Sequence, residues 1–247
     1  MASSRGGKLG AVNPSENPYP ALISLAVHEL RTPASVVGGY LRMLQKDQDP
    51  PMSERQRHMI DEAEKSCARM AAIVAELSDL GKLDGGTLKL AQQQVDLFSL
   101  LEKVAELVHE ASDRDVHLQL SGPSAGASIT GDATRLSAAF DAIFRAILRE
   151  KAGPATVAAE RRLATIDGRT SAVVIVADAS RVQEAYDRES EPFDDKRGGL
   201  GLALPLARRV IERAGGRIWS PASASAANDK PDPLTRGSVI ISVPLGS

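Results

Sequence analysis

One stretch of the chain places a histidine, a carboxylate and a hydroxyl just before a proline. Glu29 follows His28 directly, and Thr32 and Pro33 come four and five residues after the histidine. A neutral imidazole can attack a phosphoryl group through one ring nitrogen while a neighbouring carboxylate accepts the proton from the other nitrogen. On a helix, Thr32 lies one turn beyond His28, where its hydroxyl can position a water molecule. These residues predict a nucleophilic histidine, the alternative being a solvent-facing histidine beside a tolerated helix kink.

Two helical segments must position these side chains. From Tyr19 to about Asp84, apolar residues recur every three or four positions, a spacing typical of a helical bundle. The two segments are separated by a short turn with two prolines, and Ser53 and Gln56 predict a capping box at the start of the second helix. An antiparallel hairpin has only a two-helix seam, so we expect a homodimer that completes a four-helix bundle.

The chain after Asp84 alternates between element types, as expected of an α+β fold. Periodicity and turn residues predict helices over 98–112, 133–150 and 200–214, and strands over 116–121, 156–163, 171–177, 217–219 and 238–244. The polar segments 178–197 and 222–236 are expected to be loops. We therefore expect a flexible segment over 1–18, a helical hairpin over 19–84 and a second domain over 88–247.

A glycine-rich segment precedes the helix expected at 200–214. Gly198, Gly199 and Gly201 allow backbone amides to approach a phosphate, and a helix N-terminus contributes partial positive charge. Similar segments also occur as simple turns, so the glycines alone do not distinguish a phosphate-binding site from a turn. Asp178 follows an apolar strand, where an aspartate serves either as a turn residue or as a hydrogen-bond acceptor for a ligand.

Composition excludes several classes of function. A formal net charge of −2 gives no general attraction to nucleic acid or anionic lipid, and 3% aromatic residues are too few for base-stacking surfaces. The single cysteine, Cys67, excludes an internal disulfide framework and fits a reducing compartment. No apolar run approaches the roughly 20 residues that span a bilayer, and no secretory signal is visible. We expect a cytoplasmic protein with no nucleic-acid partner and no membrane span in this chain.

Residues 25–33 closely resemble the phosphoacceptor box of sensor histidine kinases, and the resemblance extends over the whole hairpin. It implies that His28 takes the γ-phosphoryl group of ATP and passes it to an aspartate of a response-regulator receiver domain. It further implies that Glu29 serves as the acid/base group and that Thr32 assists dephosphorylation of the regulator.

The second half of the chain resembles the GHKL-type ATP-binding domain of the same family. Residues 199–203, with 208–218 behind them, are similar to its second glycine box, helix and strand, and residues 191–193 match its short phenylalanine box. The resemblance implies an α/β sandwich with an ATP lid over about 180–199, and ATP and Mg²⁺ as cofactors. The implied nucleotide contacts are Asp178, Arg149, Phe193, Gly198, Gly199, Leu200, Gly201 and Leu202.

The sequence departs from this family at the nucleotide site. In a gapless alignment, Ala142 and Ala146 occupy the two asparagine positions of the family's Mg²⁺-binding helix. Mg²⁺ takes oxygen ligands, and an alanine side chain has none. The sequence therefore identifies no metal ligand in this chain. Ser180 and Val182 replace glycines of the first glycine box, and Arg197 replaces the first glycine of the second.

Three functions follow from this mixture of matches and departures. The first is a histidine kinase that autophosphorylates His28 from ATP. The second is a phosphotransfer or regulator-phosphatase module whose ATPase-like domain is not catalytic. The third, a dimer that docks regulators without chemistry, is least compatible with the complete histidine box over residues 28–33.

Overall fold

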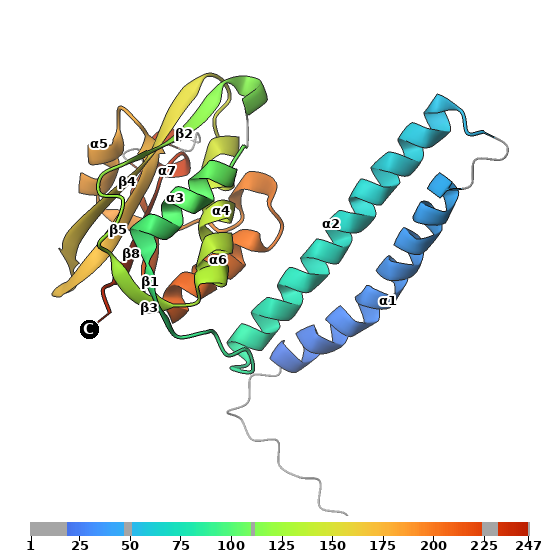
Figure 1. Ribbon diagram of the computed structural model, residues 1–247, viewed down its shortest axis with the longest axis horizontal. Helices are drawn as coiled ribbons and strands as arrows, with labels where there is room; N and C mark the ends of the chain where they lie inside the picture. The colour runs from blue at the N-terminus through green and yellow to red at the C-terminus, as the bar shows by residue number, and fades with distance from the viewer. Residues whose placement is uncertain (1–18, 47–50, 110–111, 224–231, 247) are drawn as a thin grey trace, which may run out of the picture. The chain divides into compact units, whose positions relative to one another are not determined.

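The computed structural model describes residues 19–46, 51–109, 112–223 and 232–246, and the chain divides into two compact units, 1–87 and 88–247. The first unit is a helical hairpin of α1, Tyr19–Lys46, and α2, Glu54–Asp84 (Figure 1). The predicted capping box is present at α2: the Ser53 hydroxyl accepts from the Gln56 amide, and the Gln56 side chain accepts from the Ser53 amide. The predicted pair of long helices is therefore confirmed.

Small residues let the two helices of the hairpin approach closely. The Cys67 thiol donates to the Ala34 carbonyl across the seam at 3.1 Å. A Cβ atom at Gly38 would lie only 3.2 Å from the Cys67 sulfur, so glycine suits this crossing. Further along, the Gln45 amide donates to the Glu64 carboxylate at 2.7 Å.

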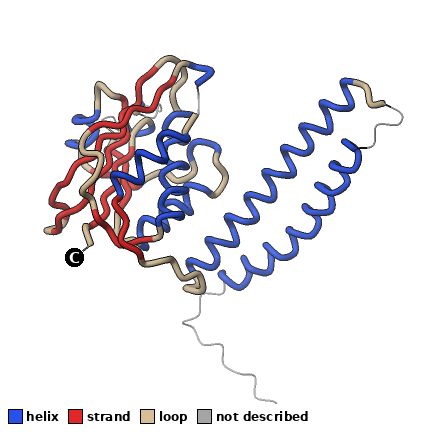
Figure 2. The backbone as a smooth tube through the Cα atoms, viewed as in Figure 1, coloured by secondary structure: helices blue, strands red, loops and turns tan. Residues whose placement is uncertain are grey.

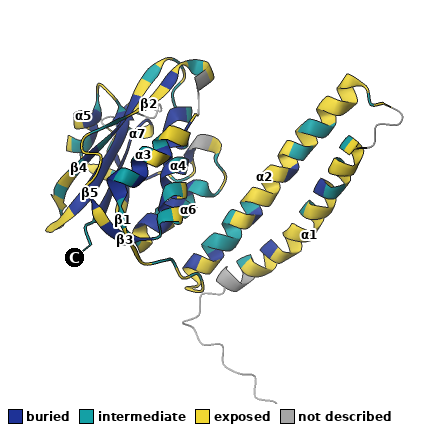
Figure 3. Ribbon diagram, viewed as in Figure 1, coloured by how far each residue is buried: buried dark blue, intermediate teal, exposed yellow. Residues whose placement is uncertain are grey.

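The hairpin buries little of its apolar surface within one chain (Figure 3). Val27, Cys67 and Val74 are buried along the seam. The large apolar side chains that stay exposed on the two helices are those of Leu25, Leu30, Val36, Val37, Tyr40, Met43, Leu44, Met59 and Met70. Leu30, Val37 and Leu44 lie seven residues apart, with Tyr40 between the last two. This spacing is typical of a coiled coil, and these side chains are exposed rather than buried in the seam.

The second unit is a mixed α/β domain (Figure 2). Its helices are α3, Leu97–Leu107; α4, Ala133–Arg149; α5, Val182–Asp187; α6, Ala203–Arg213; and α7, Pro233–Arg236, with short 3₁₀ turns η1, Ser112–Arg114, and η2, Arg197–Gly199. Its strands are β1, Gln93–Asp96; β2, Val116–Ser121; β3, Ser128–Gly131; β4, Ala155–Ile166; β5, Arg169–Asp178; β6, Ser190–Pro192; β7, Arg217–Pro221; and β8, Val239–Pro244.

Six of these strands form one sheet in the order β2-β4-β5-β8-β7-β6, and β1 and β3 form a separate antiparallel pair. The β2–β4 pairing is parallel, and every other pairing in the large sheet is antiparallel. Helices α3, α4 and α6 lie together on one face of the sheet (Figure 1). The other face carries a second apolar cluster in which Val182 and Ala185 of α5 and Leu234 of α7 pack against β4, β5 and β8.

The structure corrects several sequence-based boundaries. The first helix of the second unit ends at Leu107 rather than at residue 112, because its C-cap residue, Val108, has an extended backbone and is buried. The short strands β1 and β3 were not predicted. The expectation of a loop over 178–197 is wrong for α5, β6 and η2, since the spacing of Val182 and Ala185 within a charged stretch still buries one helix face.

The second predicted loop, 222–236, is also only partly correct. Its last residues form α7, whose N-terminus is capped by Asp232 and whose Leu234 is buried. Residues 224–231 of this segment, and the N-terminal segment 1–18, lie outside the described residues. Among the described helices, none is long and apolar enough to cross a membrane.

Candidate functional site

His28 lies on α1 with its side chain in solvent. The His28 and Glu29 side chains are 79% and 71% exposed, and His28 Nδ1 lies 3.6 Å from Glu29 Oε1. This separation allows electrostatic attraction but is longer than a hydrogen bond. Within the described residues, the second ring nitrogen, Nε2, has no hydrogen-bond partner. The arrangement leaves one nitrogen accessible to a phosphoryl donor and the other beside a carboxylate.

Helix α1 continues past Pro33 without interruption. Pro33 lies inside α1, where it has no N–H to donate to the Glu29 carbonyl four residues earlier. One backbone hydrogen bond of the helix is therefore missing directly beside His28. Thr32 is exposed one turn after His28, so the three predicted side chains share an open, solvated part of one helix.

Helix α4 offers no magnesium ligand at the two positions where the family carries asparagines. Ala142 and Ala146, at the two positions aligned with the family's asparagines, are 7% and 1% exposed, and their methyl groups cannot coordinate a metal. The nearby Arg145 is bound to Asp141, with Nε 2.8 Å from Oδ2. Among the described residues, no group of three histidine, cysteine, aspartate or glutamate side chains is placed to hold a metal. The residues present therefore do not fit the Mg²⁺ ion that the family resemblance implies.

Asp178 stands at the end of β5, but its carboxylate is already engaged. It accepts hydrogen bonds from the Ser180 hydroxyl at 2.7 Å and from the Ser180 amide at 3.1 Å. The Ser180 hydroxyl, helped by the charges of Lys151 and Arg181, holds the pKa of Asp178 below its usual range. The charge stays in place, and both of these hydrogen bonds are accepted by Oδ1, while Oδ2 accepts neither of them.

The glycine segment is folded against the body of the domain. η2 packs against α4, and Gly199 and Gly201 adopt positive φ angles of 59° and 67°, which favour glycine. Leu200 and Leu202 are half-buried, and Leu202 occupies the N-cap position of α6.

The residues just before these glycines are buried. Phe193 is 4% exposed and Arg197 is 6% exposed, with the guanidinium 4.4 Å above the phenylalanine ring. Burial and this cation–π contact hold Phe193 in place within the domain, although the segment around it is rich in charged residues.

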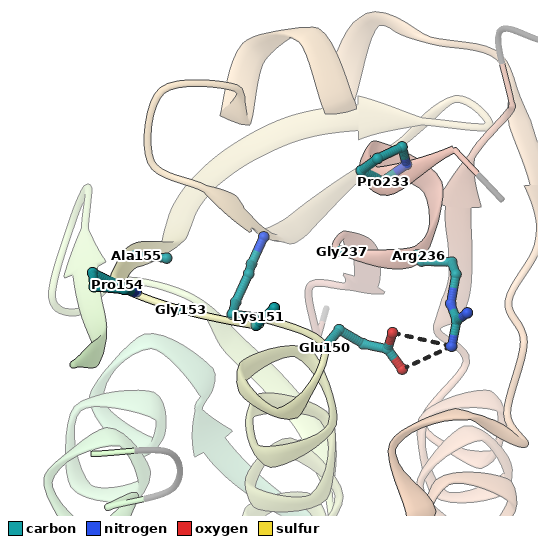
Figure 4. Close-up of a pocket in the computed structure, with 9 residues that line it drawn as sticks. Glu150, Lys151, Gly153, Pro154, Ala155, Pro233, Arg236 and Gly237 are labelled. Atoms are coloured by element: carbon teal, nitrogen blue, oxygen red, sulfur yellow. Dashed lines mark hydrogen bonds and ion pairs between the residues drawn. The ribbon is translucent and has the colours of Figure 1, made fainter. Parts of the chain in front are cut away.

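A pocket of about 510 Å³ lies beside the C-terminal end of α4 (Figure 4). Its wall includes Glu150 and Arg236, which form an ion pair at 3.1 Å, and Gly237. The Lys151 side chain extends across this pocket, and its ammonium lies 2.9 Å from the position of a Cβ atom at Gly237. Burial lowers the pKa of Lys151.

The structure thus brings together some of the predicted residues and separates others. His28, Glu29 and Thr32 share one stretch of α1, while Phe193 and the glycines share the η2 region. Asp178 interacts with Ser180 and with basic side chains rather than with the glycine segment. Arg149, the predicted phosphate contact, lies in the last turn of α4 and is half-buried.

Sequence reasoning missed the pocket residues that no motif marks. Glu150, Lys151 and Arg236 resemble ordinary charged residues at helix ends, and only the fold places them around one cavity. A signal existed for Arg197, because an arginine replaces a glycine at this point of the box. Its burial was not predictable from that replacement.

Comparison with known proteins places the hairpin in a defined family. Residues 21–86 match the His Kinase A (phospho-acceptor) domain. The chain is 28% identical over 202 residues to the signal transduction histidine-protein kinase BarA of Escherichia coli strain K12, covering 77% of this chain and 22% of BarA. It is 29% identical over 217 residues to the probable sensor histidine kinase TcrY of Mycobacterium tuberculosis strain H37Rv, covering 85% of this chain and 44% of TcrY.

The fold is shared with a solved kinase structure. Full-length ShkA, crystallised in complex with AMPPNP, superposes with a TM-score of 0.61 at 21% identity, covering 92% of this chain and 46% of ShkA. The expected α+β fold, a helical hairpin followed by an α/β domain, is confirmed. The chain spans about a fifth of BarA and less than half of TcrY. Residues 21–86 therefore match the model of the His Kinase A (phospho-acceptor) domain, and the chain is similar in sequence to signal-transduction histidine kinases.

Proposed function

We propose that this chain is a two-component histidine kinase that carries a phosphoryl group on His28 and passes it to an aspartate of a response regulator. The observation that carries the proposal is the match of residues 21–86 to a phospho-acceptor domain in which His28 is fully accessible beside Glu29. A buried histidine could not meet a phosphoryl group held by another domain or protein. The exposure of this one supports its role as acceptor.

The residues around His28 divide the reaction between them. The accessible Nε2 attacks phosphorus, an N–P bond forms, and the bond from phosphorus to the leaving oxygen of the donor breaks. Glu29, next to Nδ1, takes up the ring proton as the imidazole becomes a phosphoramidate. Thr32 orients the water that hydrolyses the regulator's aspartyl phosphate when the protein works as a phosphatase.

Dimerisation is part of the proposal. The exposed heptad-spaced stripe Leu30, Val37 and Leu44, with Tyr40, is the surface on which a second hairpin completes a four-helix bundle. The receiver domain then docks on the outer surface of the bundle near His28, and we place the whole assembly in the cytoplasm.

ATP is the proposed phosphoryl donor. The glycine segment before α6 supports it, because backbone amides of this geometry can bind phosphate oxygens. The shared fold with ShkA, whose crystal structure contains an ATP analogue, is a further support. Ala142 and Ala146 supply no oxygen ligand at the aligned positions of α4, and Asp141 is paired with Arg145, so the helix does not support Mg²⁺.

A second candidate function follows from the same absence. With Ala142 and Ala146 at the expected metal positions, and with η2 packed on α4, the α/β domain could serve as a scaffold. His28 would then receive its phosphoryl group from a phosphorylated receiver, as a phosphotransfer or regulator-phosphatase module does.

One experiment separates the two candidates. The purified chain and its His28→Gln variant are incubated with γ-labelled ATP and Mg²⁺, and in parallel with a receiver domain phosphorylated by acetyl phosphate. Acid-labile label from ATP on the wild type alone supports the kinase. Label that comes only from the receiver supports the phosphotransfer module. Label from neither donor contradicts the role of His28 as a phosphoryl carrier.

A further inference from the structure

Arg197 is a buried arginine without an ion-pair partner in the described chain. Its side chain is only 6% exposed, and no carboxylate lies within ion-pair distance of it among these residues. Burial lowers its pKa to about 10, while the more distant charges of Glu150 and Asp194 act in the opposite direction. A desolvated cation of this kind persists only where hydrogen bonds replace its lost water.

The hydrogen bonds of Arg197 join two separate segments of the domain. Nη1 donates to the carbonyls of Thr235 and Arg236 at 3.2 and 2.7 Å, and Nη2 donates to the Ser238 carbonyl at 3.2 Å. On its other side the guanidinium stacks on Phe193. One side chain thereby ties the residues before the glycine segment to the junction of α7 and β8.

This tie closes the glycine segment onto the body of the domain. The η2 turn that contains Arg197 packs against α4, so the contacts of Arg197 also hold this turn beside the helix. The carbonyls of Arg236 and Thr235 belong to the segment that forms one wall of the 510 Å³ pocket, where Glu150 holds Arg236 as well (Figure 4).

The closed arrangement leaves several polar atoms unsatisfied. Arg197 Nε, Thr235 Oγ1 and Ser238 Oγ are all buried without a hydrogen-bond partner. Buried polar groups in folded proteins are almost always paired, and unpaired ones are costly. Arg197 Nε therefore takes no part in the contacts that hold this side chain, which come from Nη1, Nη2 and the stack on Phe193.

We propose that Arg197 is a latch that controls access of nucleotide to the glycine segment of the α/β domain. In the latched form the guanidinium holds residues 193–199 against Thr235, Arg236 and Ser238. Release breaks these three bonds, lifts η2 from α4 and exposes the backbone amides of residues 198–201. The identity of the ligand rests on the proposed function, whereas the latch itself rests only on the contacts of Arg197.

The latch is tested on the full chain with two matched variants. Arg197→Ala removes the latch, and Lys196→Ala removes an exposed cation from the neighbouring position without touching the buried contacts. Hydrogen exchange of residues 193–201 and 235–238 reports opening, and titration with ADP, with and without Mg²⁺, reports access. Circular dichroism shows whether each variant is folded.

We expect slow exchange of both segments in the wild type and in Lys196→Ala, and at least about tenfold faster exchange in Arg197→Ala. The affinity for ADP rises by about tenfold in Arg197→Ala, because a closed fraction of this size weakens apparent binding by the same factor. If Arg197→Ala is not folded, Arg197→Lys serves instead, since it keeps the charge but lacks the forked donors. Intermediate exchange is expected for it.

The outcomes separate the latch from the proposed donor. Rapid exchange of residues 193–201 in the wild type, or equal exchange in the wild type and the folded arginine variant, would overturn the latch. Faster exchange in that variant with an ADP affinity equal to that of the wild type would overturn the control of nucleotide access and leave ATP as the donor for His28. The lack of ADP binding in every protein would contradict both the control of access and ATP as the donor.

Discussion

The two units of this chain differ in how far they bury their large apolar side chains. The hairpin exposes nine large apolar side chains on α1 and α2, whereas the described part of the α/β domain exposes two, Leu107 and Leu163. Strand β5 of that domain is buried from residue 171 to 177, with helices on both faces of the sheet. The hairpin is therefore an incomplete core that needs a second surface, while the α/β domain closes its core within one chain.

The same contrast holds for the motifs. The histidine box lies on the open hairpin, where its side chains are exposed and nothing in the described chain engages Nε2 of His28. Two residues of the second motif are engaged by their own neighbours: Asp178 by Ser180, and Arg197 by three carbonyls. The intact motif thus lies on an exposed helix surface, and the altered one lies where side chains bind other parts of the same domain.

The largest expected effect concerns the closed core. Phe144→Ala removes a fully buried ring that packs against Phe140, and we expect a loss of about 3–5 kcal/mol in the free energy of unfolding. Urea unfolding followed by the fluorescence of Trp219, the only tryptophan, measures this directly. Leu107→Ala, at a side chain that is 72% exposed, is the control and should change stability by less than about 0.5 kcal/mol. Equal effects would contradict the contrast between closed and open surfaces.

The next effect concerns the open surface of the hairpin. Val37→Asp places a charge on the exposed apolar stripe of α1, and burying it in a dimer without a partner is unfavourable. We expect the dimer dissociation constant to rise by about a hundredfold, which corresponds to roughly 2.8 kcal/mol. Sedimentation equilibrium measures the change. Ser35→Asp adds the same charge at an exposed polar position of α1 and should leave the dimer intact. A dimer unaffected by Val37→Asp would mean that another surface joins the chains.

A smaller effect on stability should show whether the two units unfold in separate transitions. Ser53→Ala removes the N-cap of α2 and should destabilise the hairpin by about 1 kcal/mol, without shifting the transition seen by Trp219 fluorescence. Asp132→Ala removes the N-cap of α4, where the carboxylate also binds the Ala91 amide, and should shift that transition. Far-UV circular dichroism follows the hairpin helices. A single common transition for both variants would show that the units unfold together.

The smallest effect is a pH dependence within the α/β domain. The hydrogen bond from Arg181, with that from Arg188, lowers the pKa of Glu184 to about 2. Because the folded pKa lies below the unfolded value near 4.5, the stabilisation by this carboxylate is present above pH 4.5. It is lost as the pH falls from 4.5 through about 2. The difference in melting temperature between the wild type and Glu184→Gln should therefore shrink over this range, and a constant difference would contradict the pKa.

Much of the fold was predictable from the sequence because its signals are local. The recurrence of apolar residues at every third or fourth position predicted α1 and α2, and Ser53 with Gln56 predicted the start of α2, since periodicity and capping depend on residues close in the chain. Strand β2 was predicted with its observed bounds. The strands β1 and β3 were missed because four residues carry almost no periodic signal and are fixed by pairing with each other.

The sequence by itself determined the chemistry of the hairpin, because His28, Glu29 and Thr32 lie within one and a half turns of a single helix, and helical geometry alone places them on an accessible stretch. The tertiary structure alone decided the surroundings of the glycine segment. Arg197 reaches carbonyls about forty residues away, and Lys151, Glu150 and Arg236 meet around one pocket only after the sheet and helices have packed. Burial and long-range hydrogen bonding depend on the whole fold, so no local pattern could reveal the contacts of Arg197.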